Sequence, residues 1–129
     1  MPLKSQLHIM VVDDTAVSRG LMEQGLEAIG LRNLQFEADG ESAYRRLVSA
    51  PVHLVISDMN MPGMDGLSLL EALRNHRVTQ NIGFILVTGK ASKDLILRGQ
   101  KAGMNNFIAK PFTPQQLLAS IEAVTGKLQ

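Results

Sequence analysis

The chain has 129 residues, 45% of them hydrophobic, which is enough for one domain around a single core. It has no cysteine, which excludes disulfides and thiolate chemistry, and its net charge of +1, 4% aromatic content and lack of a dense basic run argue against nucleic-acid binding. No apolar run approaches the roughly 20 residues of a membrane span, so we expect a cytoplasmic protein without membrane insertion.

Five strand-like segments alternate with helix-like segments, and they begin near residues 8, 34, 52, 82 and 106. The runs 8–12, 52–57 and 82–87 are almost wholly apolar, which is typical of central parallel strands buried on both faces. The run 34–38 alternates, as an edge strand does. The pattern predicts an α/β fold: one doubly wound (βα)5 domain over residues 1–129, with a parallel sheet in the order 2-1-3-4-5.

Helix signals follow the strands. Capping residues stand where we expect four helices to begin: Thr15, Asp65, Ser92 and Thr113. Gln116 completes a capping box with Thr113, and Pro114 suits the first helical position. Gly103 provides the left-handed residue that ends the helix begun at Ser92. The residues between these signals form amphipathic helices that can cover both faces of the sheet.

Polar side chains with phosphoryl chemistry stand at the carboxyl ends of four strands. Asp13 and Asp14 follow the first strand, Asp58 the third, Thr88 the fourth and Lys110 the fifth. Ligands of such sheets bind beyond these ends, where the winding direction reverses between the first and third strands. Clustered carboxylates raise one another's pKa values unless a cation intervenes, and Mg²⁺ prefers oxygen ligands of this kind. Each residue alone also fits helix capping or surface packing, but the combination predicts a phosphoryl-accepting site.

Four motifs carry a family resemblance: Val-Val-Asp-Asp at 11–14, Ser-Asp-Met-Asn-Met-Pro-Gly-Met-Asp-Gly at 57–66, Val-Thr-Gly at 87–89 and Lys-Pro-Phe at 110–112. With these motifs the chain resembles the receiver domains of two-component response regulators, and among them the stand-alone chemotaxis regulators of the CheY type. The resemblance implies a flavodoxin-like fold and covers essentially the whole chain, with no separate output domain.

The resemblance also implies the metal-binding and acceptor roles. Asp58 would take a phosphoryl group from a phosphohistidine of a partner kinase. Asp14, Asp58 and the backbone carbonyl of Asn60 would ligate Mg²⁺ directly, and Asp13 would do so through water. Asn60 and Lys90 would flank the path of the water that removes the phosphoryl group, and so would tune dephosphorylation.

Three further positions are implied to carry the signal. Lys110 would pair with phosphoryl oxygens, Thr88 would hydrogen-bond one of them, and Phe107 would be the aromatic residue that switches position. Phe107 lacks the hydroxyl of the tyrosine common in CheY proteins. Pro111 would follow a cis peptide bond.

A positive segment predicts where a partner binds. Residues 86–129 carry 2 acidic and 6 basic side chains, whereas residues 1–85 carry 10 acidic and 7 basic ones. Three adjacent apolar residues in this segment cannot all face the sheet at helical spacing, so we expect one of them to be exposed. The predicted surface, which suits an acidic amphipathic partner or is simply a solvated helix face, comprises Lys90, Lys93, Leu95, Ile96, Leu97, Arg98 and Lys101.

The sequence therefore predicts a signalling switch rather than an enzyme, with weak self-dephosphorylation. Its expected partners are a histidine kinase of the CheA type, a flagellar motor switch protein and a phosphatase. A phosphate sink or phosphorelay intermediate is an alternative on the same fold. A more remote alternative is a phosphohydrolase of the haloacid dehalogenase type, although that pattern requires a second aspartate where Asn60 stands.

Overall fold

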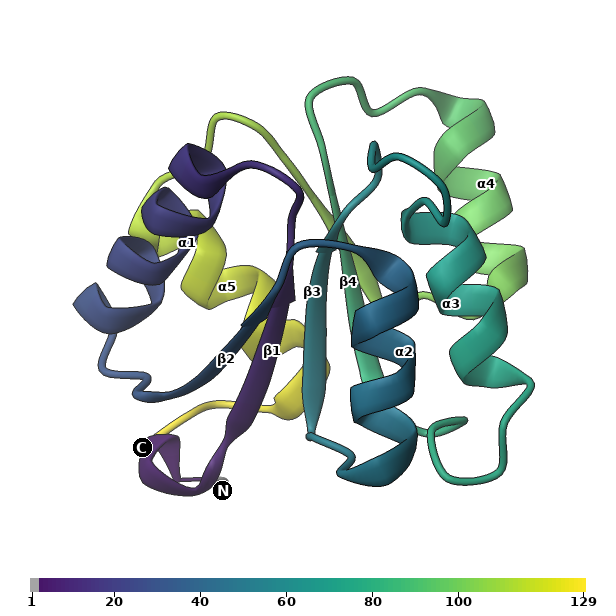
Figure 1. Cartoon of the computed structure of the whole chain (residues 1–129). Coiled ribbons are helices and arrows are strands. Elements are labelled where there is room, and N and C mark those ends of the chain that lie inside the picture. Colours follow the sequence, from purple (N-terminus) through teal and green to yellow (C-terminus); the bar gives the residue numbers. More distant parts are fainter. Residues whose placement is uncertain (1–2) are drawn as a thin grey trace.

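A five-stranded parallel sheet in the order β2-β1-β3-β4-β5 lies between two layers of helices (Figure 1). The structure is a computed structural model, and it describes residues 3–129. The strands are β1 (His8–Val12), β2 (Asn33–Glu37), β3 (Leu54–Asp58), β4 (Gly83–Thr88) and β5 (Asn106–Ala109). The order confirms the predicted doubly wound (βα)5 fold.

Five helices follow the five strands, after a short 3₁₀ helix, η1 (Lys4–Gln6). They are α1 (Ala16–Ala28), α2 (Gly40–Ser49), α3 (Gly66–Arg74), α4 (Lys93–Ala102) and α5 (Pro114–Thr125). Helices α1 and α5 cover one face of the sheet, and α2, α3 and α4 cover the other (Figure 1). None of the helices in the described part is long and apolar enough to cross a membrane.

The sheet is buried on both faces because successive residues of its central strands enter two different cores. Ile9 and Val11 of β1 belong to the core beneath α1 and α5. Met10 and Val12 belong to the core beneath α2 and α3. This arrangement explains why the central strands are almost continuously apolar. Strand β2, at the edge, is half-buried along its whole length, in agreement with its alternating sequence.

Two strands begin later than predicted. The runs 52–57 and 82–87 predicted strands, but the paired strands begin at Leu54 and Gly83. Val52 and Ile82 are buried although they precede the paired segments. An apolar residue indicates burial rather than backbone pairing, so each apolar run begins before the paired strand does.

The predicted caps are present. The side chains of Thr15, Asp65, Ser92 and Thr113 each accept a hydrogen bond from the backbone N–H three residues later. Thr113 and Gln116 form the capping box. Gly103 has a φ of 98°, the left-handed conformation that ends α4. These local signals set the helix starts and place the β3–α3 and β4–α4 loops at the carboxyl ends of the strands.

Gly66, the first residue of α3, allows the helix to approach the end of β3. A Cβ atom there would lie 2.6 Å from the Asp58 carbonyl oxygen and 2.7 Å from Leu86 Cδ1. We therefore expect Gly66→Ala to destabilise the protein by about 1–3 kcal/mol in urea unfolding. Gly20→Ala is the matched control, because a Cβ atom on Gly20 meets nothing within 4 Å. It should stabilise α1 by up to about 1 kcal/mol, and equal stability of the two variants would contradict the close-approach argument.

Candidate functional site

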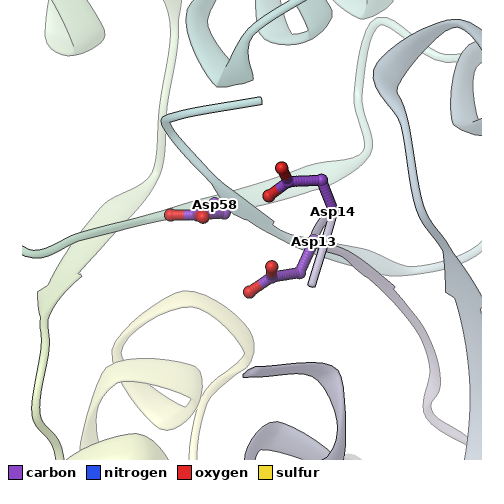
Figure 2. Close-up of side chains that lie close together, drawn as sticks. All are labelled: Asp13, Asp14 and Asp58. Carbon is purple, nitrogen blue, oxygen red and sulfur yellow. The ribbon is translucent and has the colours of Figure 1, made fainter. Parts of the chain in front are cut away.

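Three carboxylates converge at the carboxyl ends of β1 and β3. The two strands are adjacent, with Val12 in register with Ser57, so the residues that follow meet at one edge of the sheet. One carboxylate oxygen from each of Asp13, Asp14 and Asp58 lies within 4.8 Å of the others (Figure 2). Asp13 is buried and Asp14 is exposed, so the cluster has an inner and an outer side.

The first turn of α1 holds Asp13 in place. The backbone N–H of Thr15 donates to Asp13 Oδ1 at 3.0 Å, and the Ser18 hydroxyl donates to Asp13 Oδ2. Arg19 donates from Nη1 to the Asp13 carbonyl oxygen at 2.7 Å. Each Asp13 carboxylate oxygen thus already accepts a hydrogen bond from α1. These contacts fix the orientation of the Asp13 carboxylate and leave each oxygen with a further lone pair.

Lys110 reaches the same cluster from the end of β5. Its Nζ lies 3.4 Å from Asp58 Oδ1 and 3.7 Å from Asp13 Oδ2. The peptide bond between Lys110 and Pro111 is cis. The backbone N–H of Lys110 donates to the Thr88 carbonyl oxygen at 2.8 Å, which ties the lysine to the end of β4.

Burial is the main influence on the Asp58 carboxylate. Its side chain is only 12% exposed, and desolvation raises its pKa above the ordinary value of 3.8. The Lys110 ammonium lowers the pKa and the Asp13 carboxylate raises it, but the net direction is upward. A carboxylate that is costly to ionise and lies next to a cation is suited to bind positive charge or to react with an electrophile.

The donor set fits a hard divalent cation. The three carboxylates at the ends of the adjacent strands β1 and β3 supply oxygen ligands. One of them, Asp14, is exposed to solvent. Mg²⁺ is usually held by one or two carboxylates together with water and phosphate oxygens. Within residues 3–129, this is the one group of three or more acidic, histidine or cysteine side chains that can hold a metal ion.

Thr88 lies at the end of β4, and β4 is the neighbour of β3, which ends at Asp58. It is almost fully buried, and its hydroxyl accepts a hydrogen bond from the Lys90 backbone N–H at 3.1 Å. Phe107 is half-buried on β5 and packs against the core beneath α2 and α3. Lys90 and Asn60 are exposed in the loops that follow β4 and β3. The structure thus places Thr88, Lys90 and Asn60 at or beyond the carboxyl ends of their strands, whereas Phe107 lies within β5, in register with Leu86.

The residues of the predicted partner surface on α4 differ in exposure and surroundings. As expected, one of its three adjacent apolar residues is exposed: Leu97 at 58%, whereas Leu95 and Ile96 are half-buried. Arg98 and Lys101 instead line a cleft of about 500 Å³ between α3 and α4. Both cations are exposed, like Leu97.

Sequence reasoning missed Ser18. The residue stands in the first turn of α1, and its hydroxyl contacts both Asp13 and Lys110. The one signal in the sequence is its spacing, five residues after Asp13 and within reach of the cap at Thr15. That spacing is informative only when the path of the β1–α1 loop is known.

Comparison with known proteins defines the class. The model of the response regulator receiver domain matches residues 9–122. The chain belongs to this family. Within the family it is similar to chemotaxis proteins: it is 38% identical to a probable chemotaxis protein CheY of Rhizobium etli over the full length of both chains. It is 34% identical to chemotaxis protein CheY of Pseudomonas aeruginosa, covering 92% of this chain and 95% of that protein.

Solved structures agree with the fold. The chemotaxis protein CheY4 of Vibrio cholerae superposes with a TM-score of 0.86 at 27% identity, covering 93% of this chain and 99% of that one. The receiver domain of sensor histidine kinase PA1611 of Pseudomonas aeruginosa superposes with a TM-score of 0.85 at 26% identity, covering 95% and 100% of the two chains. That receiver domain has a magnesium ion coordinated in its active site cleft.

Proposed function

We propose that this receiver domain is a phosphorylation-controlled switch that accepts a phosphoryl group on Asp58 from a histidine kinase. The observation that carries the proposal is the placement of Asp58, largely buried beside two carboxylates and 3.4 Å from the Lys110 ammonium. A nucleophilic oxygen, a metal-ligand set and a fixed cation are the parts that phosphoryl transfer requires.

The residues of this chain perform the transfer by position and charge. An Asp58 carboxylate oxygen forms a bond to phosphorus while the phosphorus–nitrogen bond of the phosphohistidine breaks, and the electron pair stays on the imidazole. Lys110 neutralises charge on the phosphoryl oxygens, and the Thr88 hydroxyl donates to one of them. Asp14, Asp58 and the backbone carbonyl of Asn60 would hold Mg²⁺ directly and Asp13 would hold it through water, and the ion would supply further neutralisation of that charge.

The product is an acyl phosphate, which water can hydrolyse to restore the carboxylate. Exposed Asn60 and Lys90 lie in the loops that flank this position, and we propose that they tune the rate of this reset. The protein is then a signalling component with weak self-dephosphorylation, in keeping with the CheY-type relatives, rather than a turnover enzyme.

The output is protein binding in the cytoplasm, and the chemotaxis names of the relatives support a flagellar motor switch protein as the target. The exposed Leu97, with Lys90 and Lys93 nearby in sequence, offers an apolar and positive surface for an acidic amphipathic segment. A kinase of the CheA type and a phosphatase are the other expected partners. A phosphate sink uses the same acceptor chemistry without the motor contact.

Stoichiometry separates the switch from a phosphohydrolase. With Mg²⁺ and excess acetyl phosphate, we expect each chain to carry at most one phosphoryl group, seen by intact-protein mass spectrometry. The label should disappear once the donor is removed. Rapid multiple turnover of simple phosphate esters, with no phosphorylated protein at steady state, would contradict the proposal and favour the haloacid dehalogenase alternative.

A further inference from the structure

Ser18 contacts two charged groups of opposite sign. Its Oγ is hydrogen-bonded to Asp13 Oδ2 and lies 3.2 Å from Lys110 Nζ. A lysine ammonium can only donate hydrogen bonds and a carboxylate can only accept them. The hydroxyl hydrogen of Ser18 must therefore point to Asp13, which leaves a lone pair of Oγ to receive Lys110. The serine links the two side chains in a defined direction.

Packing alone does not fix the Lys110 ammonium. The side chain is 32% exposed and borders a cavity of about 710 Å³ between α1 and the segment that follows β5. This cavity is also lined by Ser18, Leu21 and Phe112. A four-carbon side chain beside such a space has many rotamers, so a specific polar contact is needed to hold its charged end.

The position of that charged end matters for Asp58. Its distance of 3.4 Å to Asp58 Oδ1 exceeds the roughly 2.7–2.9 Å of a close charge-assisted hydrogen bond. The ammonium thus lies near enough to neutralise an incoming phosphoryl group, yet does not bond tightly to the nucleophilic oxygen. Released from Ser18, the ammonium can move onto Asp58 and occupy the oxygen that must attack phosphorus.

We infer that Ser18 is a positioning residue that holds Lys110 at this distance and so keeps the Asp58 oxygen available for phosphorylation. The inference rests on the proposed function of Asp58. It assigns to the first turn of α1 a part in the reaction beyond helix capping and orientation of Asp13.

A double-mutant cycle with Lys110 tests this role. We expect Ser18→Ala to slow the labelling of the full-length protein by Mg²⁺ and acetyl phosphate by about five-fold, the scale of one net hydrogen bond. In a Lys110→Ala background the same substitution should have no further effect, since there is no ammonium to position. Ser18→Thr, which keeps the hydroxyl, should recover the wild-type rate.

Ser49→Ala is the matched control, because Ser49 is exposed at the end of α2 on the other layer of helices. Wild-type labelling of Ser18→Ala would overturn the inference and leave the proposed function intact. Equal slowing in the two Lys110 backgrounds would also overturn it, since that result assigns Ser18 to Asp13 or to helix stability instead. Failure of the wild-type protein itself to label would overturn the proposed function as well as the inference.

Discussion

Asp58→Asn is expected to abolish phosphorylation by Mg²⁺ and acetyl phosphate. The amide keeps the size of the side chain but removes the nucleophilic carboxylate, and neither Asp13 nor Asp14 takes its place beside Lys110 in the same way. Asp13 has both oxygens hydrogen-bonded to α1, and Asp14 is exposed. The measurement is the intact mass after incubation with excess donor, with no phosphorylated species expected for the variant.

The Asp58→Asn variant must be shown to be folded, and its unfolding temperature, which depends on the Asp58 pKa, provides that control. Folding raises the pKa of the Asp58 carboxyl group, so its ionisation lowers the free energy of unfolding. This cost is absent below the unfolded pKa of 3.8, and it grows as the pH rises above that value. Asp58→Asn should therefore unfold at a higher temperature than the wild type at neutral pH, and this difference should shrink in acid. Asp94→Asn, at an exposed position of α4, should label normally. Full labelling of Asp58→Asn would contradict the assignment.

Asp14→Ala is expected to weaken Mg²⁺ binding by at least about ten-fold, or about 1.4 kcal/mol. Asp14 is the exposed carboxylate of the cluster and has no hydrogen bond that competes with a cation among the described contacts. Isothermal titration calorimetry is the appropriate measurement, because the chain has no tryptophan to report binding by fluorescence. Phosphorylation by acetyl phosphate should slow in parallel and recover in part at high Mg²⁺.

Glu23→Ala is the control for a general loss of negative charge, because Glu23 is an exposed acidic residue of α1. It should leave the Mg²⁺ titration unchanged. The metal-free unfolding temperature of Asp14→Ala should not fall, because the substitution removes a charge from a cluster of like charges. An unchanged Mg²⁺ titration for Asp14→Ala would remove this residue from the metal site.

The arrangement of the strands and the residues at their ends could be predicted from the sequence. In a parallel sheet, all carboxyl ends meet at one edge, so Asp13, Asp58 and Lys110 had to converge once the strand order was known. The family motifs supplied part of that order. Four of the five helix starts were equally predictable, because caps such as Thr15 and Ser92 are local hydrogen bonds that depend on a few adjacent residues; Asp39, which caps α2, was not singled out.

Contacts between segments distant in the sequence were not predictable. Ser18 and Lys110 are 92 residues apart, and their hydrogen bond depends on how α1 leaves β1 and how the chain leaves β5. The cleft that Arg98 and Lys101 share with α3 depends on the packing of two helices, which the spacing of charges does not report. Leu69, Leu70 and Leu73 of α3 are all fully buried, which is more of the helix surface than a single inward stripe. Helix α3 has neighbours on both sides, α2 and α4, so more of its surface is covered (Figure 1).

Locating the phosphoryl bond tests the central claim most directly. Borohydride reduces an aspartyl phosphate to homoserine, and peptide mass spectrometry then identifies the modified position. After phosphorylation with Mg²⁺ and acetyl phosphate, we expect the change at residue 58 alone, in the peptide that contains the end of β3. Homoserine at residue 13 or 14, or at any other aspartate with residue 58 unmodified, would contradict the assignment of Asp58 as the phosphoryl acceptor.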